Sequence, residues 1–171
     1  IELVNGKYAF GECRNRTLKE QVQAAYNRWS LLNTGSATDD SKKAELKELS
    51  KKLKGYALEE FVADLLNAMG YRTKLSPQGG DSGIDITAYK DELPPRILVQ
   101  VKSGSDDIKE ATIQSLKGAM REGDYGLFIT LANYTKNAQT YLRNTPIIRG
   151  INGTELIELI LKYYDGLSDK Y

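Results

Sequence analysis

Apolar residues in the last two-thirds of the chain switch between helical and extended spacing. Over residues 58–69 they recur every three or four positions, which predicts an amphipathic helix that ends at Gly70. Three short apolar runs, separated by Gly and Pro pairs, predict a β-meander of strands at 71–75, 84–89 and 96–102. The elements predicted after them are a helix over 108–122, a buried strand over 126–129, a helix over 135–143, a strand at 147–148 and a helix over 153–164. This order predicts an α/β fold with a central mixed β-sheet flanked by helices.

The beginning of the chain is predicted to form an N-terminal helical extension. Two short alternating runs around an Asn-Gly pair predict a tight hairpin. Apolar residues at helical spacing predict a helix over 17–33, and a polar helix over 40–53 follows a turn-rich stretch. Because the chain begins at Ile1 rather than at Met, we expect a piece of a longer protein. We therefore divide it into residues 1–54, a linker or the tail of a preceding domain, and a main domain, residues 55–171.

Composition excludes several kinds of chemistry. The chain has no histidine, which removes Ser-His-Asp and Cys-His triads and every mechanism that activates water through imidazole. Its single cysteine, Cys13, cannot form an internal disulfide or a usual zinc site, so we expect a reducing compartment, the cytoplasm. No apolar run reaches the roughly 18 residues of a membrane span, so no membrane partner is expected. Catalysis by this chain would have to use carboxylates and lysine, with or without a hard metal ion.

The formal net charge of +1 is unevenly distributed. Residues 1–54 contain 11 Lys and Arg against 7 Asp and Glu, whereas the remainder contains 13 against 16. This asymmetry would allow a polyanion to meet the N-terminal extension first, but an imbalance of this size is more typical of a solvated helix surface. Charge alone therefore does not identify a nucleic-acid-binding protein.

The candidate catalytic residues lie on the second and third strands of the predicted meander. Asp85 lies on the second strand. On the third, Gln100 and Lys102 are two residues apart and share one face, while Val99 and Val101 turn toward the core. Asp85, the amide oxygen of Gln100 and the carbonyl of Val101 can hold Mg²⁺, with waters in the remaining positions. Lys102 can orient the nucleophilic water and stabilise the developing negative charge during phosphodiester hydrolysis.

The motifs around these residues occur in a specific order. LEEFVADLL at 58–66 is followed by MGY at 69–71, GDSGID at 80–85 and VQVK at 99–102. Over roughly residues 55–161, this order and spacing resemble the Mrr-like restriction endonuclease family of the PD-(D/E)xK nuclease superfamily. The resemblance implies a restriction-endonuclease-like fold for the main domain.

The same resemblance implies a role for each site residue. Asp85 would be the metal-binding acid, Lys102 the catalytic lysine, and Gln100 would take the place usually held by Asp or Glu. Glu59 matches the acid of the first helix that often supports the metal site. The neutral Gln100 should weaken divalent-ion binding because one unit of Coulomb attraction is lost, and Glu59 could partly restore it. The expected cofactor is Mg²⁺, with Mn²⁺ as the other candidate.

The function implied by the resemblance is a metal-dependent endonuclease domain that cuts double-stranded DNA and restricts foreign or modified DNA. Cutting both strands needs two active sites, so a homodimer or a transient dimer on DNA is expected. Two alternatives stay open. One is a structure-specific nuclease or junction resolvase of the same superfamily. The other is a nucleic-acid-binding module without catalysis, which the neutral Gln100 and the modest charge would favour.

Several of these features also have a purely structural interpretation. The polar residues of the predicted catalytic strands can form a solvent-facing row, and Glu59 can simply favour the helix dipole. The glycine-rich stretch 79–83 lacks the spacing of a phosphate-binding loop and predicts a turn that delivers the catalytic acid. Gln114 and Lys117 could face DNA but are typical of a solvated helix. Tyr134 is expected to keep its hydroxyl in contact with water.

Overall fold

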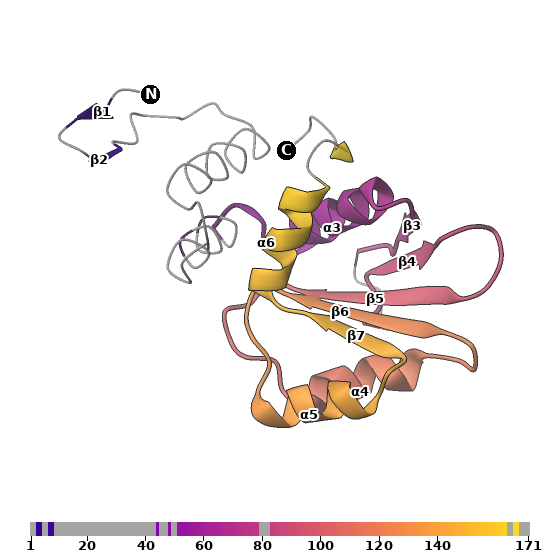
Figure 1. The fold of residues 1–171 in the computed structure, drawn as a ribbon. Helices are drawn as coiled ribbons and strands as arrows, with labels where there is room; N and C mark the ends of the chain where they lie inside the picture. The colour runs from indigo at the N-terminus through magenta and orange to yellow at the C-terminus, as the bar shows by residue number, and fades with distance from the viewer. Residues whose placement is uncertain are drawn as a thin grey trace.

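The computed structural model describes residues 51–78, 83–163 and 166–167, together with residues 3–4, 7–8, 44 and 48 (Figure 1). Near the start of the chain, β1 (Leu3–Val4) pairs antiparallel with β2 (Lys7–Tyr8), as the predicted hairpin requires. The predicted helix over 17–33, most of the helix over 40–53, and residues 79–82 lie outside the described residues.

The main domain is built on a five-stranded sheet with the order β3-β4-β5-β6-β7. Its strands are β3 (Arg72–Leu75), β4 (Ile86–Tyr89), β5 (Arg96–Lys102), β6 (Tyr125–Thr130) and β7 (Ile148–Ile151). β3, β4 and β5 pair antiparallel, so the predicted meander is confirmed. β6 and β7 join in parallel, which makes the sheet mixed and brings the carboxyl ends of β5, β6 and β7 to one edge.

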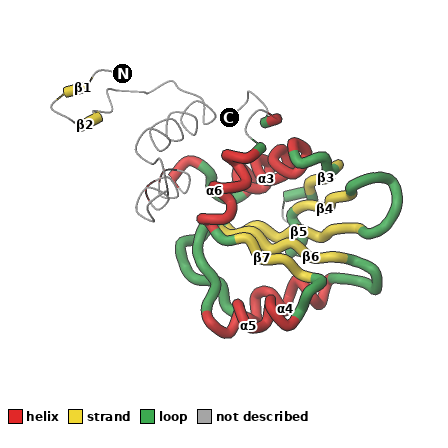
Figure 2. The backbone as a smooth tube through the Cα atoms, viewed as in Figure 1, coloured by secondary structure: helices red, strands yellow, loops and turns green. Residues whose placement is uncertain are grey.

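Helices cover both faces of the sheet, as Figure 2 shows. They are α3 (Tyr56–Ala68), α4 (Glu110–Ala119), α5 (Lys136–Asn144) and α6 (Gly153–Lys162). α3 and α6 pack on the face that contains Val99 and Val101, and α4 and α5 pack on the face that contains Leu98. Because side chains alternate along a strand, Gln100 and Lys102 share the α4 and α5 face at the end of β5. This arrangement confirms the predicted α/β fold.

Local sequence explains where the helices begin. At α6 the side chain of Asn152 accepts the Glu155 N–H, and the Glu155 carboxylate accepts the Asn152 N–H, which is a capping box. At α5 the hydroxyl of Thr135 accepts the Ala138 N–H. α3 begins at Gly55, which has no side chain to act as a cap. None of the described helices combines the length and the apolar character that a membrane span requires.

The loop after β6 corrects two expectations. The predicted helix over 108–122 starts later, at Glu110, because Ile108 forms a parallel bridge with Tyr134. Tyr134 is only 7% exposed, and its hydroxyl donates to the carbonyl of Phe128 at 2.8 Å, with the Ile151 carbonyl at 3.2 Å. The expectation of a hydrated Tyr134 hydroxyl is therefore wrong, because the bridge holds this loop against the sheet. Burial also raises the pKa of Tyr134.

Candidate active site

Asp85 is held at the point where β4 separates from β5. Its backbone N–H donates to the carbonyl of Val99 at 2.9 Å, and its Oδ2 accepts the Val101 N–H at 2.6 Å. If the strand pairing continued, the Val101 N–H would donate to a backbone carbonyl of the neighbouring strand. Here the Asp85 carboxylate accepts it instead, so the backbone pairing of β4 with β5 ends. β4 therefore begins at Ile86 and not at the predicted residue 84. The carboxylate is thereby fixed beside the last residues of β5.

Gln100 lies inside the domain rather than on its surface. Its side chain is 6% exposed, and its Oε1 is buried without a hydrogen bond from any described residue. Gly83 packs closely against it, because a Cβ atom on Gly83, whose φ is +64°, would lie 3.4 Å from the Gln100 Nε2. The interpretation as a solvent-facing row is therefore wrong for Gln100. Leaving a buried acceptor unpaired costs about 1–3 kcal/mol, so such an atom calls for an explanation such as a bound ion.

The charged residues of the predicted site influence one another. Burial raises the pKa of Glu59, which lies in the first turn of α3, and the negative charge of Asp85 raises it further, while Lys102 lowers it. Burial likewise raises the pKa of Asp85, against the lowering effects of the Val101 N–H and of Lys102. The structure thus brings Glu59, Asp85 and Lys102 together. A bound cation would favour the ionised form of both carboxylates.

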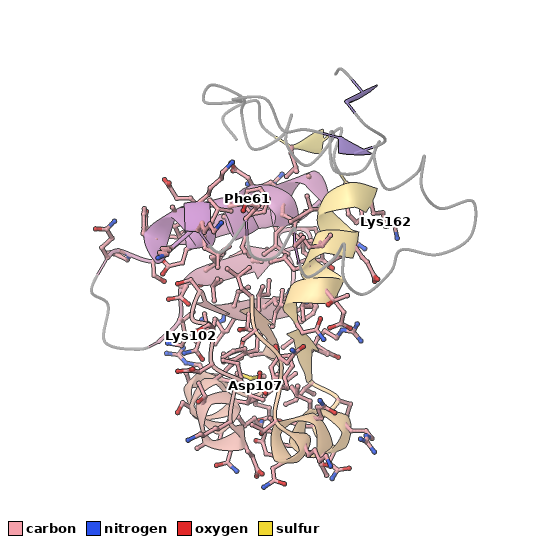
Figure 3. All side chains as sticks on the ribbon, turned by 90° about the vertical axis from the view of Figure 1, so that its left-hand side faces the viewer. Phe61, Lys102, Asp107 and Lys162 are labelled. Carbon is pink, nitrogen blue, oxygen red and sulfur yellow. The ribbon has the colours of Figure 1, made fainter. Side chains whose placement is uncertain are left out.

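Lys102 is the exposed member of this group. It is the last residue of β5, and Figure 3 shows it projecting from the edge of the sheet, between the layer of α3 and the layer of α4. Its register partner on β6, Thr130, is fully buried. The ammonium group can therefore meet an anion that approaches from solvent, while the strand that carries it is held in the core.

The atoms that could bind a metal ion here are oxygens, some of them charged carboxylate oxygens and the others neutral amide or carbonyl oxygens. The described residues contain no cluster of three or more His, Cys, Asp or Glu side chains that could hold a metal ion. An ion at Asp85 and Glu59 therefore needs neutral oxygens as well, and the unpartnered Oε1 of Gln100 can supply one. The carbonyl of Val101 points to the same side of β5 as its N–H, which Asp85 binds, so it can supply another. Hard oxygen donors of this kind fit Mg²⁺ or Mn²⁺.

Two residues beside the site were not among the predicted site residues, although Gly83 belongs to the turn predicted to deliver Asp85. Ser103 directly follows Lys102, and its Oγ accepts the Gly55 N–H at 3.1 Å. Gly83 adopts a positive φ two residues before Asp85 and leaves room for the amide of Gln100. In the sequence, the signal for either residue is its position next to a predicted site residue.

The two residues of α4 that could face DNA are exposed at the surface. Gln114 donates from Nε2 to the Glu110 Oε1 at 2.9 Å, one turn earlier on the same helix, and the Lys117 side chain is exposed. This geometry is that of a solvated helix face. That Gln114 and Lys117 face DNA stays a prediction.

Known proteins are similar to this chain in fold and in sequence. A solved structure of the MspJI restriction endonuclease in complex with a 27-mer oligonucleotide superposes with a TM-score of 0.61 at 22% identity, covering 73% of this chain and 32% of that one. The type IV methyl-directed restriction enzyme EcoKMrr of Escherichia coli strain K12 is 27% identical over an alignment 154 residues long, which covers 79% of this chain. The chain spans about half, 51%, of the length of that relative.

A comparison with protein-family models identifies the family of this chain. The model of the Mrr_cat restriction endonuclease family matches residues 50–160. The matched range contains α3, the whole five-stranded sheet and most of α6, together with all four predicted site residues: Glu59, Asp85, Gln100 and Lys102. The resemblance seen in the sequence is thereby confirmed, and the chain belongs to the Mrr_cat family of restriction endonucleases.

Proposed function

We propose that this nuclease domain hydrolyses phosphodiester bonds in double-stranded DNA, with a divalent ion held by Asp85, Gln100, Val101 and Glu59. The buried, unpartnered Oε1 of Gln100 carries the proposal, because a ligand explains such an atom next to a desolvated carboxylate. Membership of a restriction endonuclease family supports the same reaction.

Each group of the protein has its own task in this proposal. The carboxylates of Asp85 and Glu59 and the two neutral oxygens hold Mg²⁺ or Mn²⁺, and the Val101 N–H keeps Asp85 oriented. The bound ion would screen phosphate charge and make a bound water more acidic. Lys102 places its ammonium against the attacked phosphate, orients the nucleophilic water and stabilises the negative charge that develops.

The relatives support a particular class of DNA. The Escherichia coli relative is a methyl-directed type IV enzyme, and the MspJI structure contains an oligonucleotide. We infer that this chain cuts foreign or modified DNA in the cytoplasm, as the catalytic part of a type IV or type II restriction enzyme. Cutting both strands takes two copies of the site, which favours a homodimer or transient pairing on DNA.

Plasmid cleavage tests the proposal. The chain is incubated with methylated and unmethylated plasmids in Mg²⁺, Mn²⁺ or EDTA. We expect metal-dependent cleavage that Asp85→Asn and Lys102→Ala each reduce at least about 100-fold, with circular dichroism unchanged. Lys162→Ala is the matched control, because this lysine is also exposed but lies on α6, away from Lys102 (Figure 3).

The possible outcomes separate the alternatives. Wild-type rates in either site variant would show that the assigned residues are not the catalytic ones. Intact plasmid under every condition, with DNA still bound, would favour a binding module over a nuclease. Faster cleavage of branched than of linear substrates would indicate a structure-specific nuclease of the same superfamily.

A further inference from the structure

A single hydrogen bond joins the catalytic strand to the first turn of α3. Ser103 follows Lys102 at the end of β5, and its Oγ accepts the backbone N–H of Gly55 at 3.1 Å, although 48 residues separate them. Gly55 is the N-cap of α3 and has a φ of +55°, a conformation that glycine adopts without a Cβ penalty. Ser103 therefore binds the N-cap residue of α3.

Helix geometry carries this contact on to Glu59. The carbonyl of Gly55 accepts the N–H groups of Leu58 at 3.0 Å and of Glu59 at 3.3 Å, which closes the first turn. Residues four apart lie on the same face of a helix, so Gly55 and Glu59 are stacked along one side of α3. In the same turn, the Leu58 side chain is fully buried and holds the neighbouring side of the helix in the core.

The hydrogen bond between Ser103 and Gly55 lies close in sequence to groups whose charges act on Glu59. The charges of Asp85 and Lys102 both act on Glu59, and Lys102 is the residue that immediately precedes Ser103. One end of the hydrogen bond thus belongs to the strand with the catalytic lysine, and the other belongs to the helix turn with the supporting acid. The core packing of α3 against Val99 and Val101 of β5 sets the spacing of the two elements, and the Ser103 bond adds a polar contact at the end where the site lies.

We propose that Ser103 is a positioning residue, which holds the first turn of α3 so that the Glu59 carboxylate faces Asp85 and the metal ion. The inference rests on the proposed function, since it concerns the same metal site. Ser103 itself touches neither the ion nor DNA in this proposal. It acts through Gly55 and the helix turn.

A structural role and a positioning role predict different effects of Ser103→Ala. The Gly55 N–H is close to solvent, and water can replace the serine hydroxyl, so the melting temperature should stay within about 2 °C of the wild type. Mn²⁺ binding should weaken by about tenfold, because groups that orient metal ligands typically control affinity to this extent. Titration of the whole chain with Mn²⁺, followed by electron paramagnetic resonance, measures this without requiring any cleavage.

Three variants make the test specific. Ser103→Thr keeps the hydroxyl and should restore Mn²⁺ affinity to within about twofold of the wild type. Ser105→Ala removes an exposed hydroxyl from the same loop and should have no effect. In a Glu59→Gln background, Ser103→Ala should add less than about twofold, because the carboxylate that it positions is already gone.

Each result supports or overturns the inference. Equal Mn²⁺ affinity in the wild type and in Ser103→Ala would overturn the positioning role and leave the metal site intact. The same would follow if the affinity losses of Glu59→Gln and Ser103→Ala simply multiplied in the double variant. Absence of Mn²⁺ binding in the wild type would overturn the metal site and this inference with it. Amide exchange of Gly55 adds an independent check, since its protection should fall in Ser103→Ala, and unchanged protection would contradict the hydrogen bond.

Discussion

Two aspartates at opposite ends of the central strands have opposite surroundings. Asp124 lies beside the amino end of β5, is 8% exposed, and accepts hydrogen bonds from Arg96 Nε at 3.0 Å, from Arg96 Nη2 at 2.6 Å and from the Arg121 N–H at 2.8 Å. Asp85 lies beside the carboxyl end of β5, and the Val101 N–H at 2.6 Å fixes it next to the unpartnered oxygen of Gln100. One acid is saturated with partners from the protein, whereas the other adjoins an atom that has none among the described residues.

The pKa values of the two acids move in opposite directions. The hydrogen bonds from Arg96 hold the pKa of Asp124 below its usual range, whereas burial raises the pKa of Asp85. Folding therefore favours the charged form of Asp124 and opposes the charged form of Asp85. A fully bonded acid of the first kind stabilises the fold, and a desolvated acid of the second kind becomes favourable only when a cation arrives.

Removing the charge at the structural end should have the largest effect on stability. Asp124→Asn keeps the shape of the side chain but places an amide against the guanidinium of Arg96. We expect the free energy of unfolding to fall by about 2 kcal/mol, less than for a fully buried pair because the Arg96 side chain is 32% exposed. Urea unfolding at neutral pH, followed by circular dichroism, measures the change.

A matched ion pair serves as the control for this prediction. Arg72 on β3 also forms an ion pair with an acid outside the strands, Glu92 in the loop between β4 and β5, but the two side chains are 73% and 85% exposed. Glu92→Gln should therefore change the free energy of unfolding by less than about 0.5 kcal/mol. Cleavage per folded molecule should be unchanged in both variants. An Asp124→Asn chain that is fully stable, or folded but inactive, would contradict a purely structural role for Asp124.

The elements and the placement of the candidate site followed from short-range patterns. The helical stripe that begins at Leu58 is buried as predicted, and β5 has the predicted bounds with Gln100 and Lys102 on one face. Asp85 also meets β5 where the meander predicted it. These features depend on residues close in sequence or on adjacent strands, which periodicity describes well.

The missed features depend on contacts between distant segments. The last strand was predicted only for residues 147–148, whereas β7 spans Ile148–Ile151. Within β7, a Cβ atom on Gly150 would lie 2.5 Å from Leu142 Cδ1 and 3.0 Å from the Tyr134 ring. A side chain at Gly150 would therefore displace Leu142 of α5 or Tyr134 of the loop before it. The depth of Gln100 and the Ser103 contact to Gly55 likewise depend on where other elements pack.

At the functional end, removing the unpartnered oxygen should separate stability from metal binding. Gln100→Met has a similar volume and no amide, so we expect the free energy of unfolding to rise by about 1 kcal/mol. Mn²⁺ binding should weaken at least about tenfold, because a ligand is lost. Urea unfolding in EDTA and Mn²⁺ titration measure the two quantities in the same preparation.

Gln100→Glu is the complementary variant. It adds a third carboxylate beside Asp85 and Glu59, so Mn²⁺ should bind more tightly, while the metal-free chain should become less stable. Unchanged Mn²⁺ affinity in both the Met and the Glu variants would mean that Gln100 is not a ligand. The contrast between the two ends of β5 would then rest on burial alone.

The smallest expected effect is on the pH dependence of stability, measured in EDTA. The stabilisation from Asp124, whose pKa is lowered on folding, is fully present above the unfolded-state value of about 3.9 and is lost as the pH falls through the lowered folded value. Asp85 has a raised pKa, so stability declines as the pH rises from about 4 through the raised folded value. Relative to the wild type, Asp85→Asn should therefore gain stability as the pH rises above about 4. The stability that Asp124→Asn has lost should return only as the pH falls below about 4. Removal of the Asp85 charge also lowers the pKa of Glu59, which changes stability in the same direction.

If the stabilities of the two variants depended on pH in parallel, folding would not shift the pKa values of the two acids in opposite directions. The distinction between a structural and a functional end of the sheet would then fail.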